Sequence, residues 1–97
     1  RCLSDPDTAH GICEDYRASL TVDLEHDRAT LASPQRIDCP FLALWGAHGI
    51  IEQCFDPLAE WRAYAPQVQG EALPCGHYIP EEAPQQLLER VLPFLCE

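Results

Sequence analysis

Residues 73–84 read LPCGHYIPEEAP, and this stretch indicates how the second half of the chain folds. Gly76 stands directly before His77, and a glycine permits a sharp backbone turn at that point. The prolines and glutamates that follow suit the first turn of a helix, where free N–H groups and the positive end of the helix dipole favour them. We therefore predict a strand that ends near Leu73, a turn that presents His77, and a helix that begins after the turn.

Two short apolar segments predict strands. Residues 41–46 read FLALWG, a continuous apolar run that ends at a glycine, as is typical of a strand buried on both faces of a parallel sheet. Residues 68–73 show partial alternation of apolar and polar side chains and lead into the turn before His77.

Three amphipathic patterns predict helices. The first covers residues 11–29, where an apolar residue recurs at every fourth position: Ile12, Tyr16, Leu20 and Leu24. The second begins with Asp56 as its N-cap and ends at Pro66, and its buried stripe is expected to consist of Leu58, Trp61, Tyr64 and Ala65. The third runs from about Pro84 to the C-terminus, and Pro93 is expected to bend it or to end it early.

The remaining segments are expected to connect these elements. Residues 4–8 predict a turn or helix cap, residues 33–40 a connector with two prolines, and residues 47–54 a loop. The order helix, strand, helix, strand, helix predicts the α/β class, with parallel strands joined by crossover helices. Because two strands do not make a stable sheet, we expect another chain, or a missing half of the protein, to complete it.

Composition favours one soluble domain and argues against several partners. The chain has 97 residues, 46% of them hydrophobic, and a net charge of -10; its six basic residues are arginines. This charge repels phosphate groups, so nucleic acid and anionic membranes are poor partners. No apolar run approaches the roughly 20 residues that span a bilayer, and the N-terminus lacks the pattern of a signal peptide. The chain has no methionine, so we expect a truncated, processed or engineered N-terminus.

The cysteines predict neither disulfides nor a metal site. The six are widely and irregularly spaced: Cys2, Cys13, Cys39, Cys54, Cys75 and Cys96. We interpret them as small buried apolar residues in a reducing compartment. Only Cys75 and His77 stand at a spacing that metal ligands use, which is a weak signal. We therefore expect no metal and no cofactor.

Two histidines occupy the positions where this class of fold binds ligands. Ligands of open α/β sheets bind beyond the carboxyl ends of the strands, which here means the loops after Trp45 and Leu73. These loops contain His48 and His77. An imidazole titrates near neutrality and is therefore suited to act as a general base. The turn and helix start around His77 favour that role over a surface histidine without function, whereas we interpret His48 as a loop residue.

Several segments together resemble the C-terminal part of a fluoroacetate (haloacetate) dehalogenase of the α/β-hydrolase superfamily. Residues 13–18 (CEDYRA) and 23–27 (DLEHD) are similar to the helix by which that chain returns from its cap domain to the core. Residues 41–50 (FLALWGAHGI) and 57–62 (PLAEWR) are similar to its penultimate core strand, the loop and the next helix. Residues 73–84 are similar to its final strand and the loop of its catalytic base.

The resemblance implies one partial domain over residues 1–97, with residues 1–33 as the cap-to-core helix and residues 34–97 as the last two core strands and their helices. In such enzymes an aspartate displaces the halide and forms an ester, and a histidine activates the water that hydrolyses it. His77 matches that histidine. Tyr16 matches a tyrosine that helps to bind the departing halide, although its place in the apolar stripe also fits a core residue. The implied substrate is a small haloacid, and the implied location is the bacterial cytoplasm.

The other residues that this reaction needs belong to the N-terminal half of the family. They are the nucleophilic aspartate, the acid that orients the histidine, the two arginines that hold the substrate carboxylate, and the other halide ligands. Many α/β-hydrolases place the orienting acid after the Trp-Gly strand, where this chain has Gly49; Glu52, further on, is not assigned that role. We therefore expect the isolated chain to be inactive.

The sequence leaves two alternatives open. The chain could be a non-catalytic remnant or gene-cassette protein that self-associates, most simply as a homodimer, through an open sheet edge and apolar helix faces. It could also be a fragment of an epoxide hydrolase or esterase relative, in which His77 would have the same role.

Overall fold

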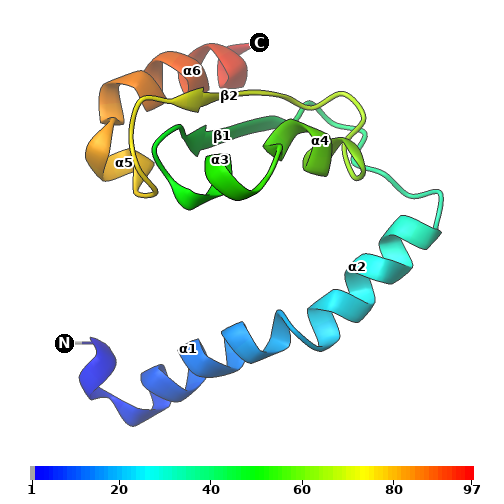
Figure 1. The fold of residues 1–97 in the computed structure, drawn as a ribbon, viewed down its shortest axis with the longest axis vertical. Helices are drawn as coiled ribbons and strands as arrows, with labels where there is room; N and C mark the ends of the chain where they lie inside the picture. The colour runs from blue at the N-terminus through cyan, green and yellow to red at the C-terminus, as the bar shows by residue number, and fades with distance from the viewer. Residues whose placement is uncertain (1) are drawn as a thin grey trace. The chain divides into compact units, whose positions relative to one another are not determined.

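A computed structural model describes residues 2–97 and divides into two compact units, residues up to Gln35 and residues 36–97 (Figure 1). The first unit is helical: it contains the 3-10 turn η1 (Cys2–Ser4) and the helices α1 (Pro6–Ala18) and α2 (Val22–Ala32). The second unit contains the strands β1 (Leu42–Gly46) and β2 (Gln69–Leu73) with four helices: α3 (Ile50–Cys54), α4 (Pro57–Arg62), α5 (Ile79–Glu82) and α6 (Pro84–Cys96).

The single helix predicted over residues 11–29 is wrong, because the chain forms α1 and α2 with a break between them. At the break, the N–H groups of Leu20 and Thr21 bond to carbonyls three residues back, at distances of 3.2 and 3.0 Å, and so tighten the last turn of α1. The Thr21 hydroxyl also donates to the Arg17 carbonyl at 3.0 Å. Side chains that bond to nearby backbone in this way favour helix ends over helix interiors.

Asp5 caps the N-terminus of α1, in agreement with the turn or cap predicted over residues 4–8. Its carboxylate accepts hydrogen bonds from the Thr8 hydroxyl at 2.7 Å and from the Asp7 N–H at 3.2 Å. Pro6 occupies the first helical position, where its missing N–H is not needed. The helix therefore begins at Pro6, several residues before the apolar stripe begins at Ile12.

Acid is expected to loosen this cap. The hydrogen bonds from Thr8 and Asp7 lower the pKa of the Asp5 carboxyl below its ordinary value. A carboxyl with a lowered pKa stabilises the fold above its unfolded pKa, and this contribution disappears as the pH falls through the folded value. The first turn of α1 should therefore fray only at a pH below the ordinary pKa range of an aspartate. The amide signal of Asp7, followed by NMR during acidification, should shift in the native chain and much less in Asp5→Asn, which keeps an acceptor that does not titrate. Equal shifts in both proteins would contradict this assignment.

The two strands of the second unit pair in parallel, as predicted. The register pairs Leu42 with Gln69 at the start and Gly46 with Leu73 at the end, so both carboxyl ends lie at the same edge. The predicted connector over residues 33–40 has no regular secondary structure, apart from bends. Asp56 caps α4 through the Ala59 N–H at 3.2 Å, as expected.

Three predicted helix boundaries differ from the structure. The predicted loop over residues 47–54 contains the short helix α3, and α4 ends at Arg62, before Pro66. At the end of α4, the N–H groups of Ala63 and Tyr64 bond to carbonyls three residues back, which closes the helix as a tighter turn. The helix α6 continues through Pro93 to Cys96. Pro93 has no N–H to donate to the carbonyl four residues back, so α6 continues through it with one backbone hydrogen bond fewer.

Helices cover both faces of the two-stranded sheet. Figure 1 shows α6 on one side of the strands and α3 with α4 on the other. Toward α4, Ala43 packs with Ala65 and Val68; toward α5 and α6, a second cluster consists of Leu73, Cys75 and Ala83, with Leu44 and Leu87 packed against it. Neighbouring residues of β1 thus contribute to opposite faces, as the pleat requires.

Much of the apolar surface of the second unit is uncovered. Trp61, predicted to be buried by its place in the helical stripe, is 43% exposed, whereas Ala65 is 1% exposed. An apolar groove of about 380 Å³ follows β1; it is lined by Phe41, Leu42, Ala43, Leu44, Trp45, Ile51, Pro57 and Trp61. Since β1 pairs with β2 alone among the described residues, its other edge is open. The groove lies where further structure could pack.

The cysteine prediction is confirmed in part. The five whose side chains the structure describes are free thiols. Cys75 is 5% exposed and belongs to the core, but the prediction of burial is wrong for Cys13, Cys39, Cys54 and Cys96, which are exposed. The side chain of Cys2 lies outside the described residues. Few elements are available to cover these positions, so a residue type that is usually buried remains at the surface.

Among the described residues, every helix is too short or too polar to cross a lipid bilayer.

Candidate active site

His77 lies on the turn between β2 and α5, four residues after the last residue of β2. Its side chain is exposed, and its ring meets the Tyr78 ring edge to face, with 5.4 Å between the ring centroids and 79° between the planes. Because β1 and β2 run parallel, this turn and the loop after β1 lie at the same edge of the sheet. That is the edge where α/β sheets bind their ligands.

Backbone hydrogen bonds join the loop after β1 to the turn that carries His77. The Ala47 N–H donates to the Leu73 carbonyl at 2.8 Å, and the His48 N–H donates to the Cys75 carbonyl at 3.0 Å. His48 therefore supports the turn through its backbone. The part of the chain before His77 is fixed to the neighbouring strand end.

Gly46 allows this close approach. A Cβ added at Gly46 would lie 2.6 Å from the carbonyl carbon of Gly76 and 2.7 Å from the carbonyl oxygen of Cys75. Backbone atoms cannot accommodate such contacts without moving. The glycine at the end of the FLALWG run is thus required by the loop packed against it.

Gly76 has a different role from the one the sequence suggested. None of the described glycines has a positive φ, so the turn before His77 does not need the left-handed backbone that glycine permits. A Cβ at Gly76 would instead lie 2.9 and 3.0 Å from the two carboxylate oxygens of Glu82. The missing side chain makes room for this carboxylate.

Glu82 holds the turn through two backbone groups. The Gly76 N–H donates to Oε1 at 3.1 Å, and the Tyr78 N–H donates to Oε2 at 2.9 Å. The sequence predicts a helix start around Glu82 and does not mark it as a site residue. The sequence offers only its position, five residues after His77, as a sign of this role. The structure adds that the short helix α5 folds back toward the turn.

Glu52, a carboxylate near this edge, has a partner other than His77. The indole N–H of Trp45 donates to the Glu52 carboxylate, and the two residues join β1 to α3. Among residues 2–97, no carboxylate forms a hydrogen bond with the ring of His77. An acid that orients this imidazole is therefore not found in the described part of the chain.

Tyr16 lies on α1, in the first unit, and its side chain is 74% exposed. His77 belongs to the second unit. The role of Tyr16 thus rests on its resemblance to the halide-binding tyrosine.

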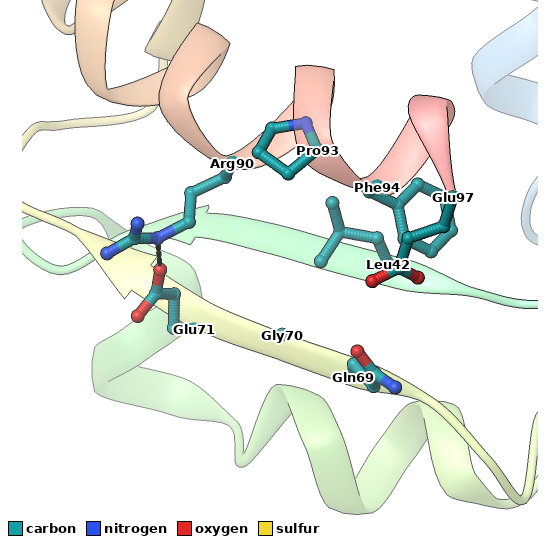
Figure 2. A pocket seen from close by; sticks show the side chains of 8 residues that line it. All are labelled: Leu42, Gln69, Gly70, Glu71, Arg90, Pro93, Phe94 and Glu97. Carbon is teal, nitrogen blue, oxygen red and sulfur yellow. Dashed lines mark hydrogen bonds and ion pairs between the residues drawn. The ribbon is translucent and has the colours of Figure 1, made fainter.

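Figure 2 shows a second groove, lined by residues of α6 and of the two strands. It has a volume of about 260 Å³ and is lined by residues that include Leu42 and Gln69, which begin the two strands. It is therefore near the amino ends of the strands, whereas His77 follows a carboxyl end. At one end of the groove, an ion pair between Arg90 and Glu71 joins α6 to β2.

No metal centre is evident among the described residues. Their His, Cys, Asp and Glu side chains nowhere form a group of three or more that could hold an ion.

Comparison with known proteins gives relatives that are about three times longer. No family model matches the chain. The chain is 30% identical over 93 residues to a fluoroacetate dehalogenase from Burkholderia sp, and the match covers 96% of this chain and 30% of that protein. A solved structure of a provisionally assigned α/β hydrolase from Nostoc sp PCC 7120 is 50% identical, with a TM-score of 0.91, over 98% of this chain and 32% of that one. A provisionally assigned epoxide hydrolase from Pseudomonas aeruginosa is 39% identical, with a TM-score of 0.85, over 95% and 30% of the two chains.

The matches agree on the architecture and differ in the activities that they name. The chain spans about a third of the length of these proteins. The comparisons support membership of the α/β-hydrolase superfamily, and the two parallel strands with their helices are part of the α/β-hydrolase fold.

Proposed function

We propose that the chain is the C-terminal section of a haloacetate-dehalogenase-like α/β-hydrolase and supplies its water-activating base, His77. The observation that carries this proposal is the place of His77 on a turn that is bonded to the adjacent parallel strand end. The resemblance of residues 73–84 to the base loop of a dehalogenase gives the imidazole its role. The substrate class follows from that resemblance and from the fluoroacetate dehalogenase among the relatives.

In the proposed reaction, an aspartate from the rest of the enzyme attacks the carbon that carries the halogen. An ester bond forms, and the halide leaves with the electron pair of the carbon–halogen bond. His77 then accepts a proton from water as the water oxygen attacks the ester carbonyl. The ester C–O bond breaks, and the proton on His77 passes to the departing hydroxyacid oxygen. The carboxyl group that forms releases the second proton of the water to solvent, which restores the aspartate. A turn exposed at the carboxyl edge of the sheet suits a base that must reach water.

Activity assays with two proteins test this proposal. The isolated chain should release no halide from fluoroacetate or chloroacetate, because it has neither nucleophile nor substrate clamp. The second protein is a chimaera in which residues 1–97 replace the matching 30% of the Burkholderia dehalogenase. The folded chimaera should release fluoride, measured with a fluoride-selective electrode. Turnover by the isolated chain, or a folded chimaera that releases no halide, would refute the proposal.

Tyr16 offers a separate test of substrate class. If its hydroxyl binds the departing halide, Tyr16→Phe should lower kcat/KM of the chimaera for fluoroacetate about tenfold, the order expected for one hydrogen bond to a charged group. Tyr64→Phe is the matched control, because Tyr64 lies beyond the end of α4, in the other unit. Equal effects of the two substitutions would argue against a halide-binding role for Tyr16.

A second candidate is a self-associating protein without catalytic activity. The observation in its favour is the open edge of β1 and the apolar groove along it, since exposed edges invite pairing with another chain. Measurement of the mass of the isolated chain in solution distinguishes the candidates. A monodisperse dimer favours this second candidate, whereas a monomer or an aggregate argues against it.

A further inference from the structure

We infer that Glu82 is a positioning residue for His77, and this inference rests on the proposed role of His77 as the base. The two amides that Glu82 binds, those of Gly76 and Tyr78, belong to the residues on either side of His77. One carboxylate thus holds the backbone both before and after the imidazole. A residue fixed on both sides has less freedom to rotate away from its working orientation.

The carboxylate is itself held by the short helix on which it lies. The Glu82 N–H donates to the Tyr78 carbonyl at 2.9 Å, so the backbone and the side chain of Glu82 both bond to Tyr78. The next residue, Ala83, is 3% exposed and packs with Leu73 and Cys75 in the core. The carboxylate is therefore anchored to the layer that carries β2.

Hydrogen bonds hold the turn on two sides, from the loop after β1 and from Glu82. On one side, the His48 N–H bonds to the Cys75 carbonyl. On the other side, Glu82 accepts the Gly76 N–H, and Gly76 lacks the Cβ that would press against the carboxylate. The hydrogen bonds toward β1 join backbone groups, whereas the bonds to Glu82 use a side chain that one substitution removes directly.

An ionised carboxylate is well suited to this task. It has two oxygens and only accepts hydrogen bonds, and charge-assisted bonds are stronger than those between neutral groups. A glutamine at this position would have one acceptor oxygen, and its amide nitrogen would face an N–H. The Glu82→Gln variant should therefore keep the size of the side chain and lose one of the two bonds.

Amide hydrogen exchange in the 97-residue chain tests whether Glu82 holds the turn, and it needs no assay of activity. In Glu82→Ala, the amides of Gly76 and Tyr78 should exchange about tenfold faster than in the native chain, because each loses a bond to a charged group. The matched control is Glu81→Ala, which removes the neighbouring carboxylate of α5; among the described residues that carboxylate has no hydrogen bond. Unchanged exchange in Glu82→Ala would overturn the inference.

Kinetics of the chimaera test the effect on His77. Glu82→Gln should lower kcat about tenfold, because the imidazole leaves its working orientation in part of the molecules, while displacement of the halide by the aspartate continues. The covalent ester should then accumulate and appear in the mass spectrum of the quenched protein. A variant that was merely less stable would lose active protein without raising the fraction in the ester form.

The controls separate this inference from the proposed function. If His77→Gln leaves turnover intact, the proposed function fails, whatever Glu82 does. If His77→Gln abolishes turnover but Glu82→Gln behaves like Glu81→Gln, the proposed function stands and the inference fails. A tenfold lower kcat with accumulated ester in Glu82→Gln alone supports both.

Discussion

Replacement of His77 by glutamine in the chimaera is expected to lower kcat for fluoroacetate by roughly 10²–10⁴-fold, the usual contribution of a general base. Glutamine can form hydrogen bonds but cannot take up the proton that the attacking water must lose. The loss should fall on hydrolysis of the ester and not on its formation. The variant should therefore release up to one fluoride per protein molecule in a burst and then stop, as fluoride detection and mass spectrometry can show together.

His48→Gln is the matched control for this experiment. His48 lies in the adjacent loop and supports the turn through its backbone N–H, which the substitution keeps. The turnover of the His48→Gln variant should stay close to that of the unmodified chimaera. If His48→Gln stops the reaction and His77→Gln does not, the base has been assigned to the wrong loop.

Substitution of Gly46 by alanine should destabilise the second unit by about 1–3 kcal/mol, the range for side-chain atoms forced into a packed region. The added Cβ would meet the backbone of Cys75 and Gly76, so the two loops would have to separate. Urea unfolding followed by tryptophan fluorescence reports this unit selectively, because Trp45 and Trp61 are the two tryptophans of the chain.

Gly49→Ala provides the comparison for Gly46. A Cβ at Gly49 would lie 3.4 Å from the Gly46 carbonyl oxygen and 3.8 Å from the nearest atoms of Gly76 and His77, close to ordinary contact. Gly49 also caps α3, where alanine is slightly less favourable than glycine. Its effect should be well below that of Gly46→Ala. Equal effects would mean that the approach of the two loops does not require Gly46.

The strands and their pairing could be predicted because the information is local. The FLALWG run is a continuous apolar segment that ends at a glycine, and residues 68–73 alternate in part and lead into the turn before His77. The helix between these two segments makes the parallel arrangement the natural one. The break between α1 and α2 could not be found in the same way. The apolar stripe continues through it, and at the break the hydroxyl groups of Ser19 and Thr21 donate to backbone carbonyls four residues back.

The candidate site was predicted in part. The sequence identified the turn and placed His77 on it because glycine, proline and glutamate have known preferences at helix starts. The sequence explained Gly76 by a sharp backbone turn, which is wrong, and it assigned no function to Glu82. Both depend on the distance between a side chain and a turn, and periodicity contains no information on that distance.

The sequence by itself determined the α/β class, the two strands and the residue offered at the carboxyl edge, because apolar periodicity and turn residues act over a few neighbouring positions. Tertiary structure alone decided that Gly46 must lack a side chain, that Glu82 binds the two amides beside His77, and that the far edge of β1 has no partner strand among residues 2–97. The Gly46 contact joins segments far apart in the chain, and the Glu82 contact depends on how α5 folds back on the turn before it. Such contacts are set by packing and not by the preferences of single residues.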